Sequence, residues 1–117
     1  MSNLTAATVP AKFRKATRIA SETALRAGEL HNSITDGEQV TVLDIRELGT
    51  MIVQANSKRK SLVDASTAAF FYAAASHFGK AADAVFAGDQ DSAAEQLDLG
   101  AAELEKIEEH VEGLFRR

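Results

Sequence analysis

The sequence of 117 residues contains no cysteine, no tryptophan and a single proline. Without cysteine, the chain can form no disulfide and offers no thiolate as a nucleophile or as a ligand for zinc or an iron–sulfur cluster. Proline is the residue that a helix interior tolerates least, so its scarcity permits long helices. The one cluster of β-branched residues, at positions 40–42, is followed directly by helical spacing. These absences argue against disulfide-rich, thiol-dependent and β-sheet proteins.

The sequence also lacks apolar runs of the length that crosses a membrane. Its longest uncharged segment is the 15 residues between Asp64 and Lys80, ASTAAFFYAAASHFG. A membrane-spanning helix needs about 20 apolar residues, whereas this segment is shorter and includes serine, threonine and histidine. The amino-terminal residues lack the basic start and apolar run of a secretory signal. We therefore expect a cytoplasmic protein without a membrane segment.

Alanine is the residue that the sequence has in abundance, with 22 copies. It is the best helix former among the amino acids, so its abundance favours helices throughout the chain. Hydrophobic residues make up 45% and charged residues 26% of the sequence, values that are ordinary for a folded soluble domain. The length suits one domain with its own core. We predict a single all-α domain over residues 1–117.

Apolar residues recur at three- and four-residue spacing in four segments, which predicts helices over about residues 10–32, 41–57, 61–87 and 91–116. Residues 1–9 carry no such spacing and are expected to be flexible. Short connections between successive helices favour antiparallel neighbours, so we predict an antiparallel up-down bundle of about four helices. No proline or glycine enforces a break near residue 57, and one continuous helix over about 42–87 remains an alternative.

Residues with capping preferences mark the ends of these segments. Thr41 and Asp44 have the spacing of a reciprocal capping pair at the start of the second helix. Ser61 is the expected cap of the third helix, and Asp91 or the serine that follows it is the expected cap of the fourth. Gly88 suits the left-handed conformation that often ends a helix.

The third predicted helix is apolar around much of its circumference. Its aromatic triplet, Phe70, Phe71 and Tyr72, sweeps roughly 200° because successive helical residues lie about 100° apart. One apolar stripe per helix closes a four-helix bundle, so this helix has a surplus of apolar surface. We predict that the surplus is a partner interface made of Phe70, Phe71, Tyr72, Phe78 and Phe86. The predicted function is a non-enzymatic protein interaction module: an adaptor, an inhibitor or an assembly component, such as those of phages. Its partner would be itself, as a homodimer or higher oligomer, or another protein.

A catalytic hypothesis rests on Arg26 and His31, which four residues separate in the segment RAGELH. This spacing resembles the motif of the HEPN family of helical ribonucleases and nucleotide-binding proteins. The resemblance implies that His31 acts as a general base on a ribose 2′-hydroxyl and that Arg26 stabilises the developing phosphorane charge. It covers six residues, and Ala27 stands where the family has a polar residue. Positions five apart point about 140° from each other on an ideal helix, so Gly28 would have to permit a distorted turn.

Charge is distributed unevenly around the net value of −4. Residues 1–60 hold nine lysines and arginines against six acidic residues, whereas residues 80–117 hold four against ten. A third hypothesis is a phosphate- or nucleic-acid-docking patch made of two basic clusters: Lys12, Arg14, Lys15 and Arg18, with Lys58, Arg59 and Lys60. The acidic net charge argues against a dedicated nucleic-acid binder, so we expect the basic start of the chain to pair with its acidic end.

The sequence contains no motif for a metal or a cofactor. Di-metal sites in helical bundles use a glutamate three residues before a histidine. The residues at that position before His31, His77 and His110 are Gly28, Ala74 and Ile107. We therefore predict no metal site and no cofactor, and no catalytic residue unless the ribonuclease hypothesis holds.

Overall fold

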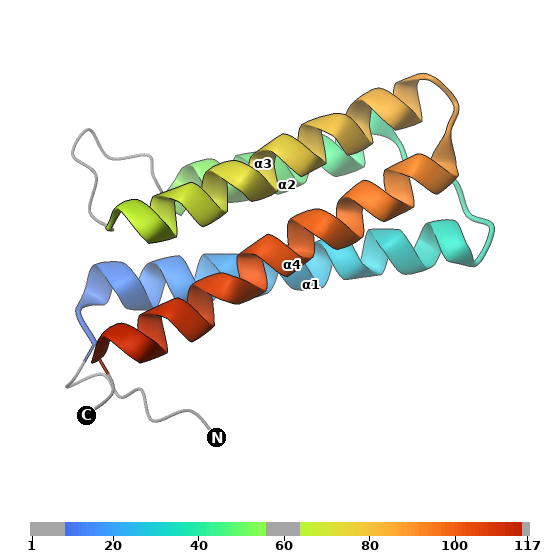
Figure 1. Ribbon diagram of the computed structural model, residues 1–117. Coiled ribbons are helices and arrows are strands. Elements are labelled where there is room, and N and C mark those ends of the chain that lie inside the picture. The colour runs from blue at the N-terminus through green and yellow to red at the C-terminus, as the bar shows by residue number, and fades with distance from the viewer. Residues whose placement is uncertain (1–8, 56–63, 116–117) are drawn as a thin grey trace.

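The computed structural model describes residues 9–55 and 64–115, and within these ranges the chain forms four helices and no strand. The helices are α1 (Ala11–Thr35), α2 (Val42–Ala55), α3 (Ala65–Phe86) and α4 (Gln90–Phe115). Successive helices run in opposite directions (Figure 1). The predicted all-α, antiparallel up-down bundle of four helices is therefore confirmed.

The four helices form a closed ring of neighbours. α4 packs between α1 and α3, and the shorter α2 completes the ring by packing against α1 and α3 (Figure 1). The centre of the bundle is filled by aliphatic and aromatic side chains that are almost completely buried, the largest being Phe71, Ile45, Leu48, Leu97, Leu104, Ile107 and Val111. Among the described residues, no helix combines the length and the apolarity needed to cross a bilayer.

The first helix is longer than the sequence pattern predicts. It continues to Thr35 rather than ending at about residue 32, because the buried Ile34 extends the apolar stripe beyond Leu30 by one more turn. Gly37 then ends the helix with a φ of 87°, and Glu38 donates its backbone N–H to the carbonyl of Ser33. This is the left-handed glycine closure that satisfies the last carbonyls of a helix.

The start of the chain is only partly as expected. Residues 1–8, which we expected to be flexible together with residue 9, lie outside the described residues. Val9 itself is buried, with 2% of its surface exposed, and its carbonyl accepts a hydrogen bond from Arg14 Nε. The prediction of flexibility is therefore wrong for Val9, because its side chain enters the apolar core.

Aspartates take part in the caps of three helices, although not always the aspartates predicted. At the start of α2, Thr41 and Asp44 form the expected reciprocal pair: the Thr41 N–H donates to Asp44 Oδ2, and the Asp44 N–H donates to Thr41 Oγ1. The start of α4 is capped by Asp89, which accepts from the Ser92 N–H, rather than by Asp91 or Ser92. The predicted left-handed Gly88 is confirmed, with a φ of 84°.

The third helix begins at a cap of its own. Asp64 has extended backbone and its Oδ1 accepts a hydrogen bond from the Thr67 N–H. α2 and α3 pack side by side in opposite directions, so the alternative of one continuous helix is wrong. The expected cap Ser61 and the predicted helix ends at residues 57 and 61 lie outside the described residues.

Candidate interaction surface

The five residues of the predicted interface occupy three different environments. Phe71 and Phe78 are buried, with 0% and 2% of their surface exposed, so they belong to the core of the bundle rather than to a docking surface. Phe70 is half-buried and its ring lies edge-on to that of His110 on α4. Tyr72 and Phe86 are exposed to 83% and 88%. The prediction is therefore wrong in placing Phe71 and Phe78 on the surface.

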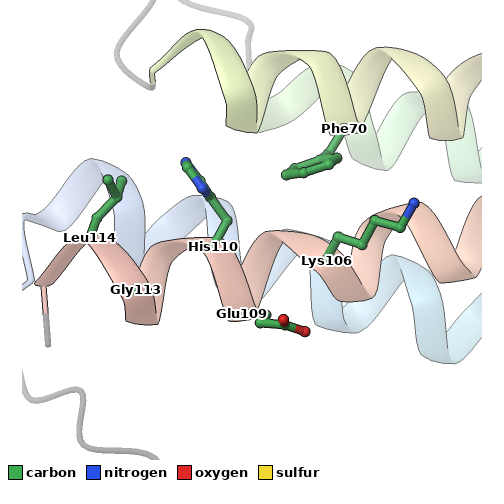
Figure 2. A pocket seen from close by; sticks show the side chains of 6 residues that line it. All are labelled: Phe70, Lys106, Glu109, His110, Gly113 and Leu114. Atoms are coloured by element: carbon green, nitrogen blue, oxygen red, sulfur yellow. The ribbon is translucent and has the colours of Figure 1, made fainter.

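Phe70 lines a hollow where the start of α3 meets the end of α4. Figure 2 shows its ring pointing toward α4, with His110 and Leu114 extending from α4 toward α3 and Glu109 pointing away. His110 Nε2 lies 2.7 Å from Asp64 Oδ2, so the residue that caps α3 is also tied to α4. Burial acts to raise the pKa of Asp64, but the hydrogen bonds from Thr67 and His110 outweigh it and lower that pKa. We interpret the contact between Asp64 and His110 as one that stabilises the packing of α3 against α4.

A line of uncharged residues runs along α3 at the border of its exposed side, where four members are exposed and Ala68, Ala75 and Ala82 are half-buried. Its members follow each other at alternating three- and four-residue intervals, the spacing that places side chains along one line of a helix: Ala65, Ala68, Tyr72, Ala75, Gly79, Ala82 and Phe86. We call this set the α3 seam. Tyr72 and Phe86 project from it, and small residues lie between them. The charged residues of α3, Lys80 and Asp83, lie outside this line.

A shallow groove runs beside the α3 seam, between α3 and α2. One hollow of about 270 Å³ is lined almost entirely by apolar groups, from Ile52, Val53, Phe71, Tyr72 and Ala75. A second hollow, of about 310 Å³, follows it along the same two helices and shares Ala75; it is lined by Ile45, Arg46, Gly49, Ala75, Phe78, Gly79, Ala82 and Asp83. Val53 is 62% exposed at the edge of the first hollow. The α3 seam and this groove together form a strip without charge except at Arg46 and Asp83.

The glycines of this strip have room around them. A β-carbon added to Gly49 or to Gly79 would meet no other atom within 4 Å. Neither glycine is therefore required for packing inside the chain. Both leave space on the outside, where another helix can approach closely. The sequence analysis did not predict a role for Gly49, Gly79 or Val53. The alternating spacing from Ala65 to Phe86 is the signal that could have identified the α3 seam.

Arg26 and His31 do not converge on a common site within the chain. Arg26 Nε lies 3.3 Å from Glu47 Oε1 on α2, and its Nη1 lies 3.3 Å from Glu29 Oε1. His31 Nδ1 instead lies 2.9 Å from the backbone carbonyl of Ala94 on α4. Burial tends to lower the pKa of Arg26, but Glu29 and Glu47 outweigh it and raise that pKa, which keeps the guanidinium charged. The two side chains therefore fasten α1 to two different neighbours.

The first basic cluster lies at the start of α1, where all four members are exposed: Lys12, Arg14, Lys15 and Arg18. The Lys12 ammonium lies 5.5 Å from the centre of the Phe13 ring, and that ring contacts Phe115 near the end of α4. The basic start of α1 thus lies beside the acidic end of α4. The second cluster, Lys58, Arg59 and Lys60, lies outside the described residues.

The described residues contain no group of three histidine, aspartate or glutamate side chains that could hold a metal ion. The fold and the surface together define the chain as an all-α four-helix bundle whose third helix exposes the rings of Tyr72 and Phe86. Comparison with family models, with curated proteins and with solved structures gives no match to this chain.

Proposed function

We propose that this protein is a non-enzymatic interaction module that binds a protein partner through the α3 seam and the adjoining groove. The observation that carries the proposal is the exposure of Tyr72 and Phe86, at 83% and 88%, on a line that contains no charge. Aromatic residues are the usual anchors of protein interfaces, where a few large side chains supply most of the binding free energy. Of the two rings, that of Tyr72 lines a hollow.

The surroundings of these rings support the same conclusion. Val53 extends the apolar strip onto α2, and the hollow between Val53 and Tyr72 offers apolar walls to an incoming side chain. Contiguous apolar surface of this kind is costly to leave in water, and on soluble proteins it commonly marks a binding site. The arginine and histidine of the catalytic hypothesis are engaged with other parts of the bundle, so the α3 seam is the better-supported site.

The proposal is tested by placing a charge on the strip and measuring association. Purified protein is examined by sedimentation velocity from about 1 to 500 μM, a range that covers weak and moderate affinities. The immobilised protein is also used to isolate binding proteins from a lysate. Tyr72→Asp is expected to abolish self-association or the capture of a specific protein, because binding would bury the new carboxylate without a partner.

Leu25→Asp provides the matched control for this experiment. Leu25 is 67% exposed on α1, beside a hollow that α1 forms with α4, so the same change is made away from the strip. Both variants should keep the helical circular dichroism spectrum of the wild type. If every association of the wild type, with itself or with another protein, is retained at full strength by Tyr72→Asp, the proposed function is wrong.

A further inference from the structure

We infer that the partner of the α3 seam is a second copy of this chain, bound about a two-fold axis that passes beside Gly79 with the two α3 helices antiparallel. This inference rests on the proposed function, since it names the partner of the same surface. It comes from the order of side-chain sizes along the seam. A two-fold interface requires a patch that is complementary to itself, and this order is nearly symmetric.

The symmetry is centred on Gly79. An alanine stands four residues before it and another stands three residues after it, at Ala75 and Ala82. An aromatic ring stands seven residues away on each side, at Tyr72 and Phe86. When two such helices pair antiparallel about Gly79, Tyr72 of each copy lies at the level of Phe86 of the other. Both ends of the pair then make the same contact.

The sizes also fit the geometry of two crossing helices. Glycine at the crossing point permits the axes to approach to about 8 Å, the short end of the range for packed helices. Seven residues along a helix correspond to about 10 Å, and at that distance from the crossing point the two axes have moved apart. Large rings are therefore needed at the ends and small residues at the centre. The space outside Gly79 is empty in the chain, as this arrangement requires.

The arrangement also assigns an occupant to the apolar hollow beside Tyr72. Phe86 of the second copy lies at that level, and the hollow between Val53 and Tyr72 is the cavity within its reach. An apolar cavity of about 150 Å³ is large enough to hold benzene. The hollow measures about 270 Å³, so it has room for the ring of Phe86. Two such insertions, one at each end, would form the core of the interface.

The buried area sets the expected strength of the pair. Four aromatic rings at roughly 150–200 Å² each bury about 600–800 Å², and Val53 with the small residues of the α3 seam adds to this. The total approaches the lower end of the 1,200–2,000 Å², approximately, that specific interfaces bury. We therefore expect a reversible dimer with a dissociation constant of micromolar order.

The first test measures how much the ring of Phe86 contributes to the affinity of the dimer. In sedimentation equilibrium, Phe86→Ala is expected to weaken dimerisation at least tenfold, because the hollow loses its occupant at both ends. Leu43→Ala is the matched control: Leu43 is 74% exposed on α2 and does not line the groove, so dimerisation should stay within twofold of the wild type. Equal affinities for the two variants would overturn the inference.

The second test determines the register and uses the absence of cysteine from the sequence. Gly79→Cys is expected to form a disulfide-linked dimer on mild oxidation, because the two positions face each other across the axis. Ala75→Cys alone and Ala82→Cys alone should not do so, since like positions lie about 12 Å and about 9 Å apart along the axis. A disulfide needs α-carbons within about 7 Å. A mixture of the Ala75→Cys and Ala82→Cys chains should cross-link between the two variants.

Each cysteine variant is first shown by sedimentation to dimerise under reducing conditions. If a cysteine variant fails to dimerise, the cross-linking is repeated with a mixture of the Ser76→Cys and Asp83→Cys chains. These exposed positions also lie at matching levels of the two antiparallel helices. Self-links at positions 75 and 82 without the mixed link would show a parallel pair. That result, or a seam-dependent dimer that forms none of these links, would overturn this inference and leave the proposed function standing. A chain that stays monomeric at about 500 μM, yet binds another protein through Tyr72, would separate the two proposals in the same way.

Discussion

At the scale of single residues, Gly100 determines how closely α3 and α4 can pack. It is buried on α4 against the ring of Phe78, and a β-carbon at this position would overlap that ring. Phe78 is itself only 2% exposed, so its ring has little freedom to move aside. The close approach of these two helices therefore depends on the absence of a side chain at one position.

Replacing this glycine is expected to destabilise the protein even though alanine is the better helix former. Gly100→Ala should gain about 1 kcal/mol of helix propensity. Forcing a methyl group into a filled core costs about 1–3 kcal/mol. Because the ring of Phe78 is confined, the cost should lie in the upper part of that range, about 2–3 kcal/mol. We therefore expect the free energy of unfolding to fall by roughly 1–2 kcal/mol in urea denaturation.

Gly113→Ala is the control for this prediction on the same helix. A β-carbon at Gly113 would meet no atom within 4 Å, so only the propensity term applies there. The free energy of unfolding should rise by about 0.5–1 kcal/mol. A Gly100→Ala protein as stable as Gly113→Ala would contradict the close contact between Gly100 and Phe78.

At the scale of the elements, α2, α3 and α4 each have an aspartate with a lowered pKa at or within one turn of their start. Hydrogen bonds from the Thr41 and Ser92 backbones lower the pKa of Asp44 and of Asp89. At Asp64, burial works against the shift, but the hydrogen bonds from Thr67 and His110 prevail. A carboxylate whose pKa is lower in the folded state stabilises that state above its ordinary pKa. The stabilisation is lost as the pH falls through the lowered value.

Asp64→Asn is expected to reduce the loss of stability in acid. Asparagine is as good a cap as aspartate, but it does not titrate and carries no charge for His110. At pH 7 the variant should be about 0.5 kcal/mol less stable than the wild type. Below the ordinary pKa of 3.8 the two proteins should converge as the carboxyl of the wild type takes up its proton. Urea denaturation at pH 7, 5 and 3 measures this convergence.

Asp98→Asn controls for the effect of removing a surface charge. Asp98 is exposed on α4 and takes no part in a helix cap. Its variant should therefore follow the wild type at each pH to within a few tenths of a kcal/mol. A constant difference between Asp64→Asn and the wild type from pH 7 to pH 3 would contradict the assigned role of the Asp64 carboxylate.

The elements that could be predicted from the sequence are those set by local chemistry. The capping pair of Thr41 and Asp44 and the left-handed Gly88 depend on a few neighbouring residues, and both were predicted correctly. The end of α1 was missed because it depends on a distant contact: the burial of Ile34 outweighs the weak helix propensity of the asparagine and serine before it. Tertiary packing fixed this boundary.

The candidate site was predicted only in part, for a related reason. The surplus of apolar surface on the third helix could be seen in the sequence. Which aromatic residues face the core depends on how the helix is rotated, and neighbouring helices set that rotation. α3 turns Phe71 inward and Tyr72 outward, although the two are adjacent in the sequence. The groove beside Tyr72 needs Val53 from another helix, and no spacing along the chain predicts that contact.

At the scale of the whole molecule, two kinds of surface are separated. The exposed basic cluster lies at the start of α1, whereas the α3 seam and its groove lie on α3 and α2. In the four-helix bundle, α1 and α3 pack on opposite sides of α4. Association through the α3 seam would therefore leave the basic cluster on α1 accessible. Apolar association also depends little on salt, whereas phosphate binding by the basic cluster would weaken steeply with it.

The proposed dimerisation through the α3 seam predicts a change in the thermal stability of the whole molecule. A partner that binds only the folded chain shifts the unfolding equilibrium by mass action, so the Tm should rise with protein concentration. For a chain of this size we expect about 2–4 °C for each tenfold increase above the dissociation constant. Differential scanning calorimetry of the wild type between about 10 μM and 1 mM measures this rise.

Tyr72→Asp should have a Tm that does not change with concentration. Leu25→Asp should follow the wild type, because its substitution lies on α1 and away from the strip. A concentration-independent Tm in the wild type would mean that the rings of Tyr72 and Phe86 remain in water at 1 mM, and the two-fold pair would then be excluded.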